Sequence, residues 1–250
     1  MIGLAGRTAL VTGGNRGIGR ATALLLARAG ADVAITYFQR AAEAEAVVAE
    51  IRALGRRALA LGGDLADAGT VERVFTGAVA ELGPLDLFVG NAGLWPSEEV
   101  PLKDMDERRW RKTIAADLDA VFLTTRAALR HMRAGGRVVL VGSTAGQRGE
   151  AYHADYAATK GAMIALVKSL AVECAPDIAV NCVAPGWVDT EMSAGALAGA
   201  GGARIVATIP LGRVASADDV AGPIAFLCSD LARHVTGEIL NVNGGSVLCG

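Results

Sequence analysis

Short runs of apolar residues alternate along this chain with longer segments whose apolar residues recur at helical spacing. The short runs predict strands and the longer segments predict helices. The expected strands are Thr8–Thr12, Asp32–Tyr37, Arg57–Leu61, Leu85–Gly90, Arg137–Ser143, Ile178–Ala184 and Glu238–Val242. The expected helices lie near residues 17–29, 41–54, 68–82, 103–133, 155–173 and 217–229. Apolar residues run continuously through these strands, which is typical of parallel strands buried on both faces of a sheet.

The alternation of strand and helix predicts a single doubly wound α/β domain over residues 1–250, with a seven-stranded parallel sheet and helices on both faces. One stretch, near residues 191–208, interrupts the alternation with a run rich in Gly and Ala. We expect a weakly ordered insertion there. It either covers a ligand site beyond the carboxyl end of a strand or is a surface excursion, and the sequence leaves both interpretations open.

Composition narrows the possible partners. Apolar residues make up 52% of the chain and aromatic residues only 4%, so the core is mostly aliphatic. A net charge of −2 gives no basic surface for nucleic acid. The chain shows neither the apolar run of about 18 residues that spans a membrane nor a signal-peptide layout. We therefore expect a cytoplasmic protein that binds neither nucleic acid nor membranes.

The four cysteines show no C-x-x-C spacing, which argues against a metal site and against a thiol nucleophile. They are expected to be small buried hydrophobic residues in a reducing compartment. The cysteines are Cys174, Cys182, Cys228 and Cys249.

Three glycines, Gly13, Gly17 and Gly19, follow the first expected strand and open the first expected helix. Glycines in this position allow a sharp turn and let the backbone approach a pyrophosphate at the helix N-terminus. Glycines also serve close packing of a helix on a strand, so the trio alone is weak evidence. Its place directly after an apolar strand favours dinucleotide binding.

Tyr156 and Lys160 lie four residues apart on an expected helix and therefore share one face. A cation held there favours the phenolate, so we expect the pKa of Tyr156 to fall below its usual value of about 10. Such a tyrosine is a candidate general acid for reducing a carbonyl, although this pair also occurs by chance on many helices. Ser143 ends the fifth expected strand, which places its hydroxyl near Tyr156 at the carboxyl edge of the sheet.

Together these motifs closely resemble the short-chain dehydrogenase/reductase family, and the resemblance covers essentially the whole chain. It implies a Rossmann-type fold and hydride transfer between a nicotinamide nucleotide and an alcohol or carbonyl. The glycines have the spacing G-x-x-x-G-x-G that is typical of the family. The other motifs that carry the resemblance are Asp64, Asn91-Ala-Gly93, Ser143, Tyr156 with Lys160, Pro185-Gly186 with Val188 and Thr190, and Asn243-Gly-Gly245.

The resemblance implies that Tyr156 protonates the carbonyl, that Ser143 polarises it, and that Lys160 bonds the nicotinamide ribose and lowers the pKa of Tyr156. Asp117 stands where the family has an Asn that supports a water-linked proton path from the lysine. An aspartate accepts a bond from water but cannot donate as an amide does, and it adds charge near Lys160. The expected catalytic residues are therefore Ser143, Tyr156, Lys160 and Asp117. A second departure is Gly90, where the family usually has Asn.

For the nucleotide, the resemblance assigns Asp64 to the adenine amino group, Asn91 and Gly93 to the region of the adenosine ribose, and Val188 and Thr190 to the carboxamide. From the residues alone, Asp64 reads equally as a helix cap and Pro185-Gly186 as a turn. The full expected set is Gly13, Asn15, Arg16, Gly17, Ile18, Gly19, Tyr37, Arg40, Asp64, Leu65, Asn91, Ala92, Gly93, Tyr156, Lys160, Pro185, Gly186, Val188 and Thr190.

The residues at the end of the second expected strand favour NADP(H) as the nucleotide, although NAD(H) stays possible. Sites that prefer NAD usually have an acidic residue there to bond the ribose 2′-hydroxyl. The segment Ile35–Arg40 contains no carboxylate. Arg16 and Arg40 are expected to pair with a 2′-phosphate, although Arg16 is also compatible with a solvated helix start.

Phrases in the last quarter of the chain, such as Ile209–Val214 and Ala225–Asp230, most resemble the 3-oxoacyl-[acyl-carrier-protein] reductase branch. That resemblance implies an NADPH-dependent ketoreductase for acyl or polyketide chains, with the substrate possibly held by an acidic carrier protein. Four arginines are a candidate docking face or a solvated helix end: Arg126, Arg130, Arg133 and Arg137. The family is commonly tetrameric through the helices near 103–133 and 155–173, so a homotetramer is expected.

Two other functions stay open. One is an NAD(P)-dependent dehydrogenase of a small secondary, sugar or cyclic alcohol, and the other is a non-catalytic nucleotide-sensing protein. The residues expected around the substrate are Leu94, Trp95, Gln147, Tyr152 and Trp187, together with the 191–208 segment. The two tryptophans indicate an apolar or ring-shaped substrate, unless they only pack.

Overall fold

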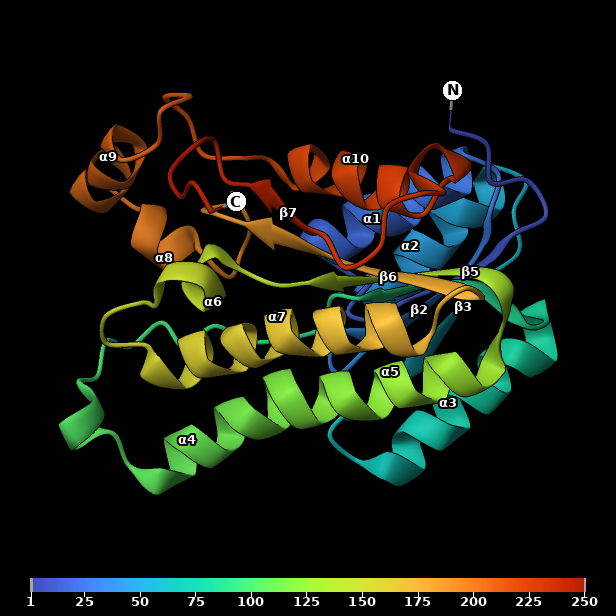
Figure 1. Ribbon diagram of the computed structural model, residues 1–250, viewed down its shortest axis with the longest axis horizontal. Helices are drawn as coiled ribbons and strands as arrows, with labels where there is room; N and C mark the ends of the chain where they lie inside the picture. The colour runs from blue at the N-terminus through green and yellow to red at the C-terminus, as the bar shows by residue number, and fades with distance from the viewer. Residues whose placement is uncertain (1, 250) are drawn as a thin grey trace.

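Seven strands form one parallel sheet in the computed structural model, which describes residues 2–249. In chain order they are β1 (Thr8–Val11), β2 (Asp32–Tyr37), β3 (Ala58–Gly62), β4 (Leu85–Gly90), β5 (Met132–Val141), β6 (Ile178–Pro185) and β7 (Ile239–Val242). Their order in the sheet is β3-β2-β1-β4-β5-β6-β7, so the winding reverses between β1 and β4. The predicted doubly wound fold is confirmed (Figure 1).

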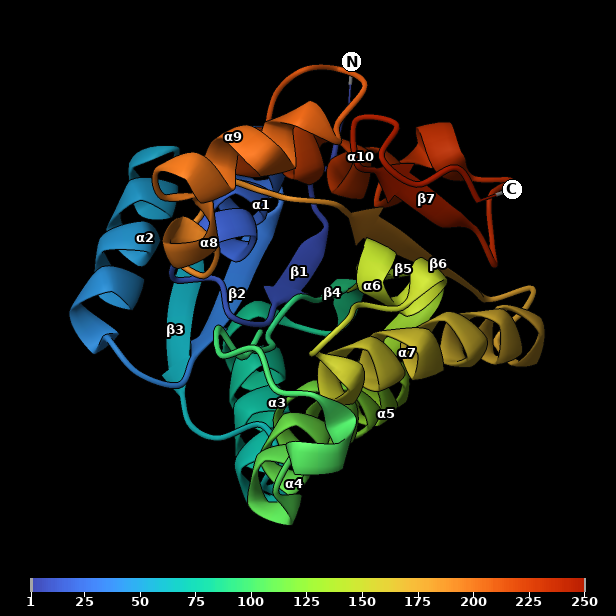
Figure 2. The ribbon, with the colours of Figure 1, turned by 90° about the vertical axis from the view of Figure 1, so that its left-hand side faces the viewer.

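Helices cover both faces of the sheet (Figure 1). On one face lie α1 (Gly17–Arg28), α2 (Ala41–Ala53) and α10 (Ala217–Leu227), and on the other lie α3 (Ala68–Leu82), α5 (Ala120–His131) and α7 (Ala154–Glu173). Shorter helices surround the carboxyl ends of the strands (Figure 2). They are α4 (Glu107–Ile114), α6 (Thr144–Arg148), α8 (Ala194–Leu197) and α9 (Ala200–Ala207). Single 3₁₀ turns span Leu102–Asp104 and Asp230–Ala232.

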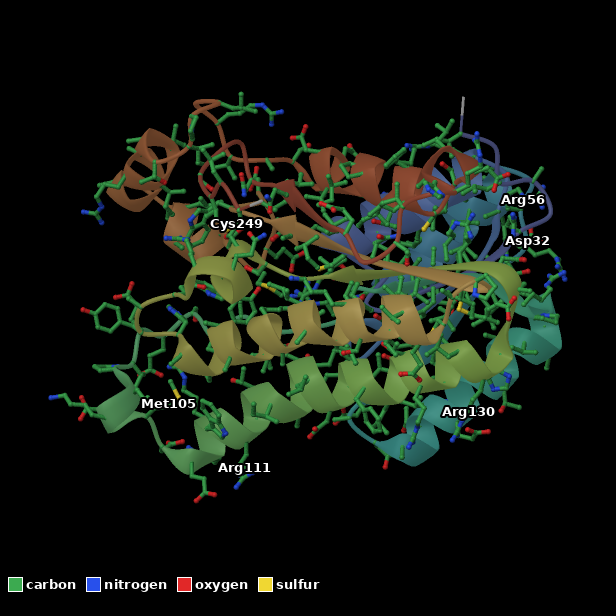
Figure 3. The ribbon with its side chains drawn as sticks, in the orientation of Figure 1. Asp32, Arg56, Met105, Arg111, Arg130 and Cys249 are labelled. Carbon is green, nitrogen blue, oxygen red and sulfur yellow. The ribbon has the colours of Figure 1, made fainter. Side chains whose placement is uncertain are left out.

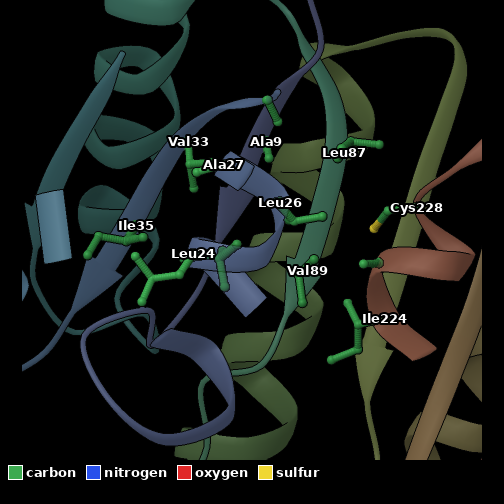
Figure 4. Close-up of a cluster of buried hydrophobic side chains, with 14 of the residues drawn as sticks. Ala9, Leu24, Leu26, Ala27, Val33, Ile35, Leu87, Val89, Ile224 and Cys228 are labelled. Carbon is green, nitrogen blue, oxygen red and sulfur yellow. The ribbon is translucent and has the colours of Figure 1, made fainter. Parts of the chain in front are cut away.

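Each central strand supplies apolar side chains to both faces, because successive residues of a strand point in opposite directions. In β5, Val139 and Val141 join the core cluster under α1, α2 and α10, whereas Val138 and Leu140 join the cluster under α3, α5 and α7. Figure 4 shows the first cluster, in which α1 and α10 pack side by side against the sheet. This two-sided burial explains the continuous apolar runs in the sequence.

The structure departs most clearly from the predicted elements in three segments. The single helix expected near 103–133 is divided: α4 and α5 are joined by a π-helical turn at Ala115–Asp119. Strand β5 begins at Met132 instead of Arg137 and ends at Val141 instead of Ser143. The stretch near 191–208 contains the two short helices α8 and α9 instead of irregular backbone.

The four cysteines differ in how deeply they are buried. Burial raises the pKa of Cys182 to about 11 and that of Cys228 to about 12, so these thiols match the prediction of inert buried residues. Cys174 is half-buried and Cys249 is exposed, so the prediction of burial is wrong for Cys249. Among the described helices, none is long and apolar enough to cross a membrane.

Candidate active site

A cavity of about 650 Å³ opens at the carboxyl edge of the sheet, where the loops after β1 to β6 converge. Almost every residue expected to bind nucleotide lines this cavity, as do Ser143, Tyr156 and Lys160. Of the expected nucleotide set only Gly19 is absent from the lining. The position agrees with the rule that doubly wound sheets bind ligands where the winding reverses.

The turn over residues 13–19, which contains Gly13, Gly17 and Gly19 and is called the glycine turn below, leaves room for a ligand to approach the start of α1. Gly13 has a φ of 64°, and a Cβ placed on it would lie 3.2 Å from Cα of Ala92. A Cβ on Gly19 would collide with the carbonyl oxygen of Gly13, so Gly19 serves the packing of helix on turn. No side chain caps α1 at Arg16, and its first N–H groups lack a side-chain acceptor. The turn therefore fits a pyrophosphate.

Asn91 fastens the end of β4 to the glycine turn. Its Nδ2 donates to the carbonyl oxygen of Thr12 at 2.9 Å, and the Thr12 hydroxyl accepts from the backbone N–H groups of Asn91 and Ala92, each at 2.9 Å. Asp64 accepts a bond from the N–H of Ala66 at 2.9 Å. The carboxylate that caps α3 is instead that of Asp67.

Ser143, Tyr156 and Lys160 come together at the cavity wall. Ser143 is the N-cap of α6 and accepts from the N–H of Ala145 at 3.1 Å, while a hydrogen bond joins its hydroxyl to the Tyr156 phenol. Lys160, one turn along α7, has its Nζ 5.5 Å from the centre of the Tyr156 ring. The same ammonium donates to the carbonyl oxygen of Val141 at 3.2 Å. These contacts hold an acid, a donor hydroxyl and a cation beside one cavity.

The pKa of Tyr156 is raised above its ordinary value, contrary to the sequence prediction. Desolvation of the phenol by the surrounding protein is the largest cause. Lys160 and the hydrogen bond with Ser143 act in the opposite direction, as expected, but they are outweighed. The phenol of Tyr156 is therefore protonated at neutral pH, which is the state that a proton donor needs.

Asp117 is fully buried in the π-helical turn, near Lys160. Its Oδ1 accepts from the N–H of Leu94 at 2.7 Å, and its Oδ2 has no hydrogen-bond partner among residues 2–249. A Cβ placed on Gly93 would lie 2.9 Å from Asp117 Oδ1 and 3.6 Å from Lys160 Nζ. Burial raises the pKa of Asp117, and the charge of Lys160 opposes that effect. Asp117 does not line the cavity itself.

Two tryptophans form one wall of the cavity. Their rings meet edge to face with centroids 5.7 Å apart, and Trp95 also stacks on the buried His153 at 4.9 Å. Trp95 Nε1 donates to Glu150 Oε1 at 3.1 Å. Leu94, Trp95 and Trp187 all line the cavity.

Gln147 and Tyr152 do not line this cavity, and their assignment to the substrate site stays a prediction. Gln147 Nε2 donates to Asn241 Oδ1 at 2.6 Å and thereby ties α6 to β7. The Tyr152 side chain is 52% exposed. Its backbone has a φ of 67°, and its carbonyl accepts from Val100 N–H at 3.1 Å. The sequence places both residues near Ser143 but does not show which way their side chains point.

Sequence reasoning missed several cavity residues, among them Phe38, Arg148 and Glu150. Glu191 and Met192, which also line the cavity, belong to the segment expected around the substrate. Phe38 follows Tyr37 directly and is 68% exposed. Its place just beyond the end of β2 could have identified it from the sequence as a residue of the nucleotide site. Glu191 meets Arg16 and Arg40 across more than 150 residues of chain. No local sequence pattern predicts these two ion pairs.

Comparison with known proteins agrees with this geometry. A family model described as enoyl-(acyl carrier protein) reductase matches residues 13–246. A cis-4-hydroxycyclohexanecarboxylate dehydrogenase of Sinomonas cyclohexanicum is 43% identical over 242 residues, which are 96% of this chain and 96% of that protein. A 3-oxoacyl-[acyl-carrier-protein] reductase of Synechocystis sp. is 38% identical over 252 residues, covering 99% of this chain and 100% of that protein.

Among solved structures, a short chain dehydrogenase from Burkholderia cenocepacia J2315 in complex with NADP superposes with a TM-score of 0.92. The two chains are 40% identical, and the match covers 97% of this chain and 98% of that one. The chain is therefore a member of the short-chain dehydrogenase/reductase family, in the branch similar to 3-oxoacyl-[acyl-carrier-protein] reductases, and an NAD(P)-dependent oxidoreductase that acts on alcohol and ketone groups.

Proposed function

We propose that this protein is an NADPH-dependent ketoreductase that converts a carbonyl to a secondary alcohol. The observation that carries the proposal is the position of Tyr156 at the cavity wall, beside Ser143 and with Lys160 Nζ 5.5 Å from the centre of its ring. The nicotinamide, when bound, supplies the hydride. Ser143 orients and polarises the carbonyl oxygen, and Tyr156 donates the proton as negative charge develops on that oxygen. Lys160 stabilises the phenolate that remains.

The preference for NADP(H) rests on the adenosine end of the cavity. Arg16 and Arg40 both line it, and the segment between β2 and Arg40 contains no carboxylate that would repel a 2′-phosphate. Guanidinium groups suit phosphate because their N–H groups match its oxygens in pairs. The related Burkholderia structure in complex with NADP supports the same preference.

For the substrate, the aromatic wall favours a compact, apolar or ring-shaped ketone. Trp95 and Trp187, whose rings meet edge to face, give the cavity an apolar aromatic surface that suits a ring. The relative that acts on cis-4-hydroxycyclohexanecarboxylate, by its name, supports a cyclic substrate. The 3-oxoacyl thioester expected from the sequence is the second candidate, and the relatives named for that activity support it.

Two of the four arginines in the candidate docking face for a carrier protein form hydrogen bonds within the chain. Arg133 donates to the carbonyl oxygen of Pro84 at 3.2 Å and to Asp86 at 3.3 Å, and Arg137 donates to the carbonyl of Gly135 at 2.9 Å. Arg130 lies toward the amino ends of the strands, away from α6 and α8 (Figures 1 and 3). A carrier docked there would face the end of the sheet opposite to the cavity, which weakens the case for a carrier-bound substrate.

An NADPH-oxidation screen tests this proposal. Cyclic ketones with and without a carboxylate, sugar ketones and 3-oxoacyl thioesters are compared at one concentration of enzyme. We expect turnover of at least one class, with cyclic ketones fastest. Nucleotide binding without turnover of any ketone would instead favour the non-catalytic, nucleotide-sensing alternative.

A further inference from the structure

The carboxylate of Glu191 lies between the two arginines that are expected to hold a 2′-phosphate. Arg16 Nη1 is 2.9 Å and Arg40 Nη1 is 2.7 Å from the same oxygen, Oε2, of Glu191. Arg16 comes from the glycine turn, Arg40 precedes α2, and Glu191 comes from the segment after β6. All three side chains line the cavity. The bridge therefore spans the adenosine end of the nucleotide site.

The backbone that carries Glu191 is anchored independently of the two arginines. Ser193 is buried, its hydroxyl donates to the carbonyl oxygen of Val188, and it accepts from the N–H of Thr190 at 3.2 Å. A Cβ placed on Gly17 would lie 3.4 Å from Cγ2 of Thr190, so this turn packs against the glycine turn. The Glu191 side chain is itself 56% exposed. It can leave the arginines for solvent without moving the turn.

We infer that Glu191 is a specificity-determining residue whose carboxylate competes with the 2′-phosphate for Arg16 and Arg40. The inference rests on the NADP(H) preference proposed above. A phosphate monoester carries nearly two negative charges and three acceptor oxygens, so it displaces a single carboxylate from both guanidinium groups. A 2′-hydroxyl carries no charge and leaves the bridge intact. Glu191 thus weakens binding of a 2′-phosphorylated nucleotide but has little effect on the unphosphorylated one.

Arg40 has a second carboxylate partner, which limits the size of the effect. Its Nη1 lies 3.1 Å from Glu43 Oε1 on α2, and that contact remains when Glu191 is removed. Glu191 is the carboxylate that neutralises both arginines at once. Exposed ion pairs of this kind contribute little each, so removal of Glu191 should strengthen phosphate binding about threefold to tenfold.

The test uses two fragments that occupy only the adenosine end, so that no reaction at the nicotinamide intervenes. Adenosine 2′,5′-bisphosphate and 5′-AMP are titrated calorimetrically into wild-type protein and Glu191→Gln at the same low ionic strength. A matched control is Glu50→Gln, which removes the carboxylate of an exposed pair with Arg20 at 2.8 Å on α1 and α2. We expect Glu191→Gln to bind the bisphosphate about threefold to tenfold more tightly, with 5′-AMP affinity within about twofold and the control like wild type.

Unchanged or weaker bisphosphate binding by Glu191→Gln overturns the inference, because the carboxylate would then be neutral or would help to position the arginines. The wild-type titrations separate this failure from failure of the proposed function. If wild type binds the bisphosphate and 5′-AMP equally, and Arg40→Ala changes neither, the NADP(H) preference is wrong. If wild type prefers the bisphosphate but Glu191→Gln does not increase that preference, only the role of Glu191 is wrong.

Discussion

At the scale of single residues, the proton on Tyr156 depends on opposed effects. Desolvation raises the pKa of the phenol, Lys160 and Ser143 lower it, and the negative charge of Asp117 raises it again. A reductase needs the protonated phenol at the moment of hydride transfer, and the net balance supplies it. The sequence identifies Tyr156 and Lys160 by their spacing. It does not predict the direction of the pKa shift, because that direction depends on how completely the folded chain excludes water from the ring.

Replacing Asp117 by Asn tests the contribution of this carboxylate. The amide oxygen of Asn can still accept the bond from Leu94 N–H, so we expect activity at neutral pH to be retained. Loss of the negative charge lowers the pKa of Tyr156. Since reduction is lost as pH rises through that pKa, the alkaline limb of the kcat profile should move to lower pH in Asp117→Asn.

Profiles of kcat against pH for wild type and Asp117→Asn, measured in one buffer series, check this expectation. A large loss of activity at neutral pH would show that the aspartate has a catalytic task of its own. An alkaline limb that stays in place would show that Asp117 carries no charge felt by Tyr156.

At the scale of secondary-structure elements, an ion pair joins α4 to the start of α7, the helix that carries Tyr156. Arg109 Nε lies 3.1 Å from Oδ2 of Asp155, which is fully buried and directly precedes Tyr156. The Thr113 hydroxyl donates to the same oxygen at 2.8 Å. Burial acts to raise the pKa of Asp155, but the bonds from Arg109 and Thr113 outweigh it and leave that pKa below its usual value.

Replacing Arg109 by Met should destabilise the protein, because it leaves the Asp155 carboxylate buried without its cation. Loss of one partner of a buried pair costs about 3 kcal/mol, which lowers the melting temperature by roughly 6–12 °C in a domain of this size. A carboxyl group with a depressed pKa stabilises the fold above its unfolded pKa of about 4, and that contribution is lost as pH falls. The deficit of Arg109→Met should therefore be largest near neutral pH.

Thermal melts of Arg109→Met between acidic and neutral pH measure this deficit. The control is Arg111→Met, which breaks the exposed Arg111–Glu107 pair of the same helix at 3.2 Å and should change stability by less than about 0.5 kcal/mol. If both variants melt alike at neutral pH, the Arg109–Asp155 pair does not hold α4 against α7.

The same scale shows where sequence prediction of elements succeeds and where it stops. Strands β1, β2, β4 and β6 are continuous apolar runs, and their predicted bounds agree with the structure to within one residue. The π-helical turn at Ala115–Asp119 has no sequence signature of its own, because its residues continue the helical pattern. It nevertheless orients Asp117 toward Leu94, and π-bulges are often found at functional sites.

At the scale of the whole molecule, the winding of the chain assembles a site from segments that are distant in sequence. The reversal between β1 and β4 brings the glycine turn beside Asn91, and β5 and α7 add Ser143, Tyr156 and Lys160. Motif order predicts this assembly because parallel strands all end at one edge. Contacts between side chains from remote loops, such as Glu191 with Arg16, have no such rule and emerge only from the folded chain.

The expected homotetramer is a proposal at this scale. Phe122 on α5 is 50% exposed, with the Arg126 guanidinium 4.8 Å from the centre of its ring, and Val172 on α7 is 82% exposed. Apolar residues exposed on both helices support association through α5 and α7. Light scattering should give a mass near four times the chain mass of 25.5 kDa.

Phe122→Glu should shift that mass to smaller species, because it places a charge in the proposed contact. Leu102→Glu, which changes a residue that is 63% exposed but lies outside both helices, serves as the control and should leave the mass unchanged. A tetramer that survives Phe122→Glu would place the contact on other surfaces.

The central claim is that Tyr156 is the proton donor of a ketoreductase, and Tyr156→Phe tests it most directly. The measurement is the rate of NADPH oxidation with the best ketone of the screen, at nucleotide concentrations shown by fluorescence titration to saturate both proteins. Loss of a general acid typically costs a factor of about 10²–10⁴. We expect a fall of that size with NADPH affinity unchanged, because the ring of Phe keeps the packing of the site. A variant that reduces the ketone at the wild-type rate would contradict the account.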